Sequence, residues 1–120
     1  MKIDRKQILE AFLENISRMT DKDYQERVWV RVEGPECDDI DETIAYFFEE
    51  DALIDNYQDF DINETQLTAL RVLHKNLRTF TDTYGIYSPF KSTKKLINMP
   101  EWEKIMEMAK EVLEEFHYKK

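Results

Sequence analysis

Glycine, proline and cysteine are scarce in this sequence of 120 residues, which contains two glycines, three prolines and one cysteine. So few turn-forming residues argue against an all-β fold and against the glycine-rich loops that bind phosphates. The single cysteine, Cys37, cannot form a disulfide within the chain, so the composition fits a reducing compartment. We therefore expect a mainly helical protein with a cytoplasmic location.

Long apolar runs are also absent. None approaches the roughly 20 residues that span a bilayer, and residues 1–6 lack the apolar core of a signal peptide. The chain has 26 acidic against 17 basic side chains, a formal net charge of −9, which opposes binding to nucleic-acid phosphates. The sequence predicts one soluble domain over residues 1–120, with neither a membrane nor a nucleic acid as partner.

Apolar residues recur at three- and four-residue intervals in four stretches, a spacing that places them on one face of a helix. The stretches follow Asp4, Asp39, Asn63 and Pro100, which are residue types that begin helices. We predict a single-domain bundle of about four helices. The second would run from 39 to about 57, the third would end at Gly85, and a connection over 86–99, pinned to the core by its own apolar residues, would lead to the fourth.

Residues 27–33 follow a different pattern, because a valine stands at every second position before Gly34-Pro35. Such alternation is typical of a β-strand. The sequence offers no second strand, and a lone strand leaves backbone groups unpaired. The segment is therefore an extended stretch laid on the helices, a strand completed by another chain, or a misread helix. We expect one short extended segment here.

Basic residues are missing between Arg31 and Arg71. This interval contains thirteen acidic residues and carries a charge of −13, so the rest of the chain carries +4 by difference from −9. A run of acidic residues is often only a solvated surface. Natural helices usually interleave the two signs, however, so the pattern also favours an external partner that supplies the cations.

An acidic row with a tyrosine in it lies on the second predicted helix, where Asp39, Glu42, Tyr46 and Glu49 fall at i, i+3, i+7 and i+10. Tyrosine in such a row is a residue type that anchors protein interfaces, although an ordinary half-exposed side chain is an equally good interpretation. The predicted partner-binding residues are Glu33, Glu36, Asp38, Asp39, Asp41, Glu42, Tyr46, Glu49, Glu50, Asp55, Tyr57, Asp59 and Asp61.

Catalytic and metal-binding motifs are not recognisable. Residues 59–63 begin like a calcium loop, but Glu64 replaces the glycine of the sixth position and Leu70 the glutamate of the twelfth. One cysteine and two distant histidines do not make a zinc site. We expect no metal, no cofactor and no enzyme activity, and we expect His74 to be a packing residue at the edge of the core.

Three features occur together: Trp29 before the turn Gly34-Pro35-Glu36, the pair Phe47-Phe48 after an acidic stretch, and the closing run Pro100-Glu101-Trp102-Glu103-Lys104-Ile105. Over about residues 29–118 they resemble the small bacterial immunity proteins of polymorphic toxin and contact-dependent growth inhibition systems. The resemblance implies a cytoplasmic, non-enzymatic inhibitor whose acidic surface docks on a basic toxin domain, often a nuclease. No contact residue is carried over from that family.

Two alternatives stay open at this point. The chain could be a regulatory module that binds a basic cellular protein, or that forms a homodimer by pairing residues 27–33 as strands. It could also be a small enzyme that uses His74 with an acidic residue.

Overall fold

The computed structural model describes residues 4–36, 38–84 and 92–118. Its elements, in chain order, are α1 (Arg5–Arg18), α2 (Lys22–Tyr24), η1 (Gln25–Val30), α3 (Ile40–Glu49), α4 (Ala52–Asp55), η2 (Tyr57–Phe60), α5 (Glu64–Tyr84), α6 (Thr93–Ile97) and α7 (Pro100–Glu115). The segment η1 is a π-helix and η2 is a 3-10 helix. These ranges contain no β-strand, so the predicted mainly helical fold is confirmed.

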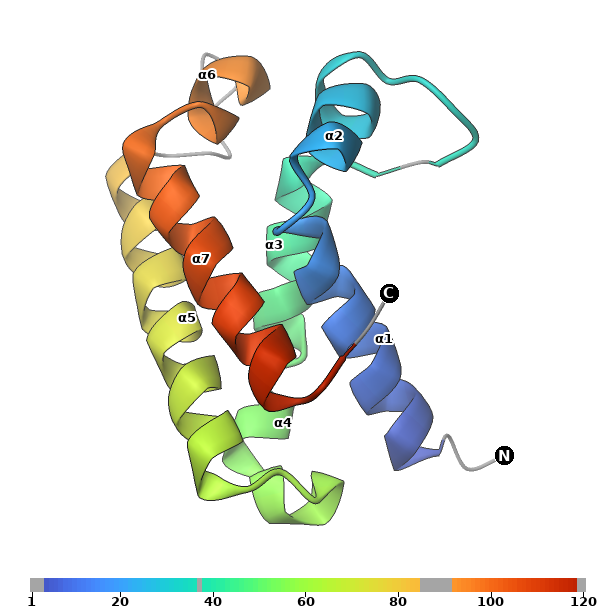
Figure 1. Ribbon diagram of the computed structural model, residues 1–120, viewed down its shortest axis with the longest axis vertical. Helices are drawn as coiled ribbons and strands as arrows, with labels where there is room; N and C mark the ends of the chain where they lie inside the picture. The colour runs from blue at the N-terminus through green and yellow to red at the C-terminus, as the bar shows by residue number, and fades with distance from the viewer. Residues whose placement is uncertain (1–3, 37, 85–91, 119–120) are drawn as a thin grey trace.

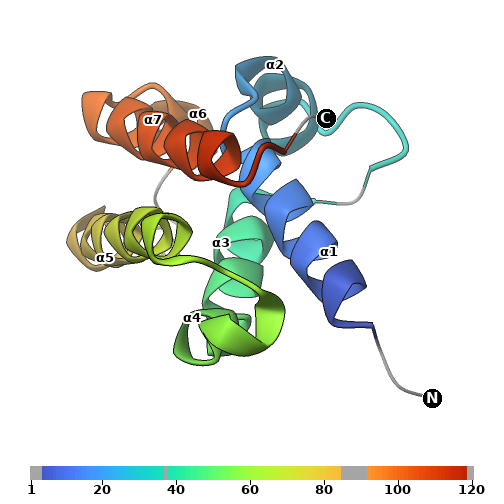
Figure 2. The same cartoon turned by 60° about the horizontal axis from the view of Figure 1, so that its bottom comes forward.

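The two longest helices, α5 and α7, run antiparallel and side by side along one flank of the molecule (Figure 1). On the other flank α1 packs against α3 and against α7. The short helix α4 lies at the bottom of Figure 2, away from α2 and α7 at the top. None of the described helices is both long enough and apolar enough to cross a membrane.

The core is one connected cluster that draws apolar side chains from every long helix. Trp102 of α7 is fully buried, with its ring centroid 6.1 Å from that of Trp29 and 5.5 Å from that of Phe80. Its indole N–H donates to Oε1 of buried Gln25 at 3.0 Å, and the Gln25 amide donates to the carbonyl of Arg18 at 3.0 Å. These hydrogen bonds give partners to the buried polar groups of Trp102 and Gln25, and they join η1 to both α7 and α1.

Helix starts follow the sequence signals. The backbone N–H of Glu42 donates to the Asp39 carboxylate at 2.7 Å, which caps α3. Asn63 and Gln66 form the reciprocal pair of side-chain to backbone bonds, at 2.8 and 2.9 Å, that fixes the start of α5. Pro100 occupies the first turn of α7. These three predicted starts are confirmed, as is the cap at Asp4.

The extended segment predicted near 27–33 is wrong, because residues 25–30 are helical. The N–H of Arg31 donates to the carbonyl of Glu26 at 3.0 Å, the five-residue spacing of a π-helix. Val28 and Trp29 are both buried, whereas a strand would place these neighbours on opposite faces. The backbone N–H and C=O groups of residues 25–30 belong to a helix, so they do not form the free edge of a strand. The structure therefore does not support a homodimer made by strand pairing of this segment.

The predicted count of about four helices is too simple. The expected helix over 39–57 ends at Glu49, and α4 and η2 follow as separate short turns. Acidic residues at 49–51 stand at the end of α3, where the helix dipole disfavours negative charge. The connection before α7 contains α6, whose Leu96 and Ile97 are buried as expected of a segment pinned to the core. The expected helix end at Gly85 and the cysteine at Cys37 lie outside the described residues.

Candidate partner-binding surface

The first part of the acidic interval, residues 33–36, is balanced by arginines. Arg27 donates from Nη1 and Nη2 to the two carboxylate oxygens of Glu36, at 2.9 and 2.6 Å, and Arg31 lies 3.1 Å from the Glu33 carboxylate. The Arg27 hydrogen bonds lower the pKa of the Glu36 carboxyl from 4.5 to about 2. Gly34 makes room for this pair, since its φ is +98° and an added Cβ would lie 2.3 Å from Arg27 Nη1.

Asp38 is bound inside the protein. Its side chain is 8% exposed, and it accepts hydrogen bonds from the Tyr24 hydroxyl at 2.9 Å, the Trp29 indole at 2.9 Å and the Thr43 hydroxyl at 3.0 Å. An Arg18 nitrogen lies 3.9 Å away. Burial, and next the bond to Asp38, raise the pKa of Tyr24 to about 12. Asp38 thus joins η1 to the start of α3, and little of its carboxylate is left for a partner.

The remaining acidic residues behave differently, and six of them are exposed on α3, α4, η2 and the turn that follows. They are Asp39, Glu42, Glu49, Asp55, Asp59 and Asp61, called here the α3–η2 acidic surface. In the described part of the chain, no Lys, Arg or His nitrogen lies within the 4.0 Å of an ion pair from any of these carboxylates. None of these six carboxylates therefore forms an ion pair within the described part of the chain.

Four predicted site residues are half-buried: Asp41, Tyr46, Glu50 and Tyr57. Tyr46 packs on the core at the seam between α3 and α1, and burial, followed by the charge of Glu50, raises its pKa. The Tyr57 hydroxyl donates to the Glu64 carboxylate at 2.9 Å. Burial and the neighbouring Asp39 raise the pKa of the Asp41 carboxyl. The two tyrosines are thus edge residues of the core with one polar side toward solvent.

His74 lies against two aromatic rings, with its centroid 5.8 Å from Phe47 and 5.2 Å from Phe48. Its Nε2 is 3.9 Å from an oxygen of Asp51. This placement at the edge of the core fits the expected packing role. Across the ranges that the structure describes, no three His, Cys, Asp or Glu side chains are grouped so that they could hold a metal ion.

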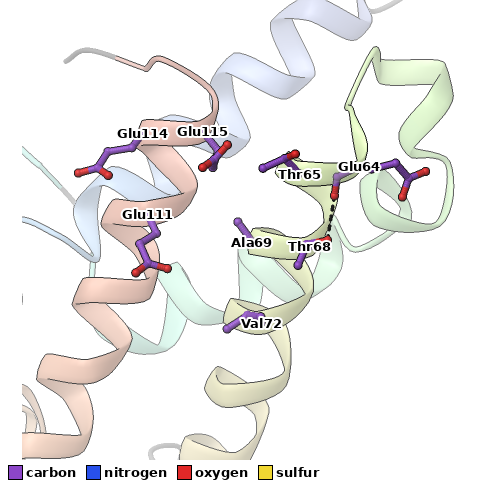
Figure 3. A pocket seen from close by; sticks show the side chains of 8 residues that line it. All are labelled: Glu64, Thr65, Thr68, Ala69, Val72, Glu111, Glu114 and Glu115. Carbon is purple, nitrogen blue, oxygen red and sulfur yellow. Dashed lines mark hydrogen bonds between the residues drawn. The ribbon is translucent and has the colours of Figure 1, made fainter.

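A second acidic feature, which the sequence reasoning missed, is a groove of about 430 Å³ between α5 and α7 (Figure 3). Its lining residues are Glu64, Thr65, Thr68, Ala69 and Val72 on α5, and Glu111, Glu114 and Glu115 on α7. The two sides of the groove are about forty residues apart in the sequence, outside any local window. The available signal was the cluster of three glutamates at the end of the last helix.

Neither acidic feature could be compared with a known site: the chain matches no family model, no curated protein and no solved structure.

Proposed function

We propose that this chain is a non-enzymatic inhibitor that binds a basic protein through the α3–η2 acidic surface, and that the partner is a toxin domain, as in bacterial immunity proteins. The observation that supports the proposal is the set of six exposed carboxylates with no basic partner in the described part of the chain. The resemblance of residues 29–118 to immunity proteins supplies the identity of the partner.

Electrostatics gives the proposal a mechanism. A nuclease needs a basic cleft to hold phosphates, and carboxylates spaced along α3 and η2 would occupy that cleft in place of nucleic acid. Complementary charge speeds association, toward roughly 10⁸–10⁹ M⁻¹s⁻¹ at low salt, and the half-buried rings of Tyr46 and Tyr57 would add apolar contact that slows dissociation. Added salt should weaken binding, because it screens exposed charges.

The test is co-expression of this chain with the C-terminal domain of the protein encoded by the neighbouring gene, followed by co-purification and by a growth assay. We expect binding that is tight at about 50 mM salt and clearly weaker at about 300 mM, together with rescue of growth. No complex and no rescue would contradict the toxin proposal, and binding to a different basic protein would then favour the regulatory module.

A pair of charge reversals locates the surface. Glu42→Lys with Glu49→Lys should weaken toxin binding at least about tenfold at low salt, because two exposed carboxylates become like charges facing the basic partner. The matched control is Asp82→Lys with Glu107→Lys, which reverses two exposed acidic residues on α5 and α7 and changes the net charge equally. Equal losses in both variants would show that overall charge, rather than the α3–η2 acidic surface, determines the affinity.

A further inference from the structure

The groove between α5 and α7 has an apolar floor and an acidic rim. On α5, Thr65, Thr68, Ala69 and Val72 follow one another at i, i+3, i+4 and i+7, the spacing with which one helix presents a face to another. Val72 is 42% exposed and is one of the two large hydrophobic side chains that the described residues leave exposed. The Thr68 hydroxyl donates to the carbonyl of Glu64 at 2.9 Å, so its hydrogen bond is already made within α5.

Four glutamates and no lysine or arginine are among the residues that line the groove. The Glu64 carboxylate points away from α7 (Figure 3) and accepts from the Tyr57 hydroxyl, so the acidic rim is the α7 side. Glu115 lies on the α5 side of α7, Glu111 lies one turn before it, and Glu114 extends to the opposite side (Figure 3). At this end of the groove the Gln66 amide of α5 donates to the carbonyl of Glu115 of α7 at 3.1 Å, which links the two helices. A preformed and rigid groove lowers the entropic cost of binding.

Helix electrostatics is an independent observation at the same place. The last turn of α7 contains Glu114 and Glu115 and no basic residue, although the helix dipole favours positive charge at a C-terminus, and Glu111 lies one turn before Glu115. These glutamates therefore oppose the stability of the helix that carries them. A cation brought by a partner would offset both the repulsion on the rim and the unfavourable end of the dipole.

We propose that this groove docks a helix of a partner protein that presents small aliphatic residues along one face and lysine or arginine on either side of it. Aliphatic side chains would pack on Ala69 and Val72, and the basic residues would pair with Glu111 and Glu115. A second copy of this chain does not fit, since its own α5–α7 face would place glutamates against glutamates. Nucleic acids and anionic lipid surfaces are repelled by the same rim.

The proposal stands apart from the toxin proposal, because it concerns a different surface and requires no toxin. The probe is a fluorescent synthetic helix of about 16 residues, four turns or more, with alanine and leucine on one face flanked by lysines. The control peptide has the same composition in a scrambled order that removes the amphipathic face. Affinity is measured by anisotropy at about 50 mM salt, and the binding site is mapped by amide chemical shifts.

We expect the amphipathic peptide to bind, the scrambled peptide to bind at least about fivefold more weakly, and the shifts to cluster at residues 64–72 and 111–115. Glu111→Gln with Glu115→Gln should weaken binding about fivefold, and Val72→Ser about threefold. The matched variant Asp82→Asn with Glu107→Gln, which removes two exposed charges from the same two helices outside the groove, should bind the peptide as the unchanged protein does. Thermal unfolding adds a readout without peptide, since Glu111→Gln with Glu115→Gln should raise the melting temperature.

Three results would each overturn the proposal: no binding of the amphipathic peptide, equal affinity for both peptides, or shifts that map to α3 instead of the groove. A lower melting temperature in Glu111→Gln with Glu115→Gln would also contradict it, because the glutamates would then serve the fold. Failure of the toxin experiment would leave these results unaffected, and the two proposals are therefore tested separately.

Discussion

Residues 33–38 and residues 39–61 are both rich in acidic residues and contain no lysine or arginine, but the charges of the first region are balanced by neighbouring arginines and those of the second largely are not. Glu33 and Glu36 pair with Arg31 and Arg27, and Asp38 is nearly buried among hydrogen-bond donors. The α3–η2 acidic surface has no such partners in the described part of the chain. A count of charges along a sequence therefore does not give the charge of a surface.

The difference in pairing between the two regions follows from the path of the backbone. The loop at 31–36 turns back onto η1, where Arg27 binds Glu36, and the positive φ of Gly34 permits that close return. Asp38 then lies beside Arg18 of α1. The residues after Asp39 instead line helices whose buried sides are apolar and whose outer sides are acidic. A carboxylate therefore links elements of the fold in the first region and is an exposed charge in the second.

Replacing Asp38, the nearly buried acidic residue of the first region, should have the largest effect on stability. Asp38→Ala removes the nearly buried carboxylate that accepts from the Tyr24 hydroxyl and from the indole N–H of buried Trp29, so we expect a loss of about 3 kcal/mol in the free energy of unfolding. Urea titration at neutral pH measures this loss. Glu42→Ala is the control from the second region and should change stability by less than about 0.5 kcal/mol. Similar values for the two variants would remove the distinction between the regions.

An intermediate effect is expected from the ion pair of Glu36. Its carboxyl has a pKa of about 2 in the folded protein against an ordinary value of 4.5, so the pair stabilises the fold above pH 4.5. That contribution is lost as the pH falls from 4.5 toward 2, because protons then bind the unfolded chain first. The stability gap between the unchanged protein and Glu36→Gln should therefore shrink over this interval in acid titrations followed by circular dichroism. A constant gap would show that Arg27 does not hold the carboxylate.

The smallest effect should come from the α3–η2 acidic surface. Glu49→Gln removes repulsion from the neighbouring Glu50 and a negative charge from the C-terminal end of α3, so we expect stability to rise by about 0.5 kcal/mol or less at low salt. The gain should disappear at about 300 mM salt, where the repulsion is screened already. Thermal unfolding at both salt concentrations measures the change. A loss of stability would mean that this carboxylate has a partner inside the fold, as those of residues 33–38 do.

Much of the fold could be predicted from the sequence because helix signals are local. Capping residues at 4, 39 and 63 and the proline at 100 each mark a start through contacts with the next few residues. The segment at 27–33 could not be predicted from its alternation. The burial of Trp29 depends on the contact of its ring with Trp102, which lies in α7 far along the chain, and on its hydrogen bond to Asp38 beyond the loop.

The candidate site was predictable in part. Six of the thirteen proposed residues are exposed and without basic partners in the described chain, as a regional excess of negative charge indicates. The arginine pairs at 33–36 and the burial of Asp38 could not be predicted from the sequence, because they depend on the path of the backbone that brings these residues together. The α5–α7 groove could not be predicted, since its lining combines residues 64–72 with residues 111–115 only where the two helices lie side by side.

The sequence by itself determined the helical class, the starts of the four predicted helices and the acidic net charge. Periodicity and capping depend on neighbouring residues, and net charge depends on composition alone. Only the tertiary structure decided which acidic residues remain free, since neutralisation depends on distances of a few ångströms between side chains far apart in the sequence. Coulomb energy falls with separation in space and is indifferent to separation along the chain. The composition therefore gives the amount of charge, and the packing of the helices decides where that charge is available to a partner.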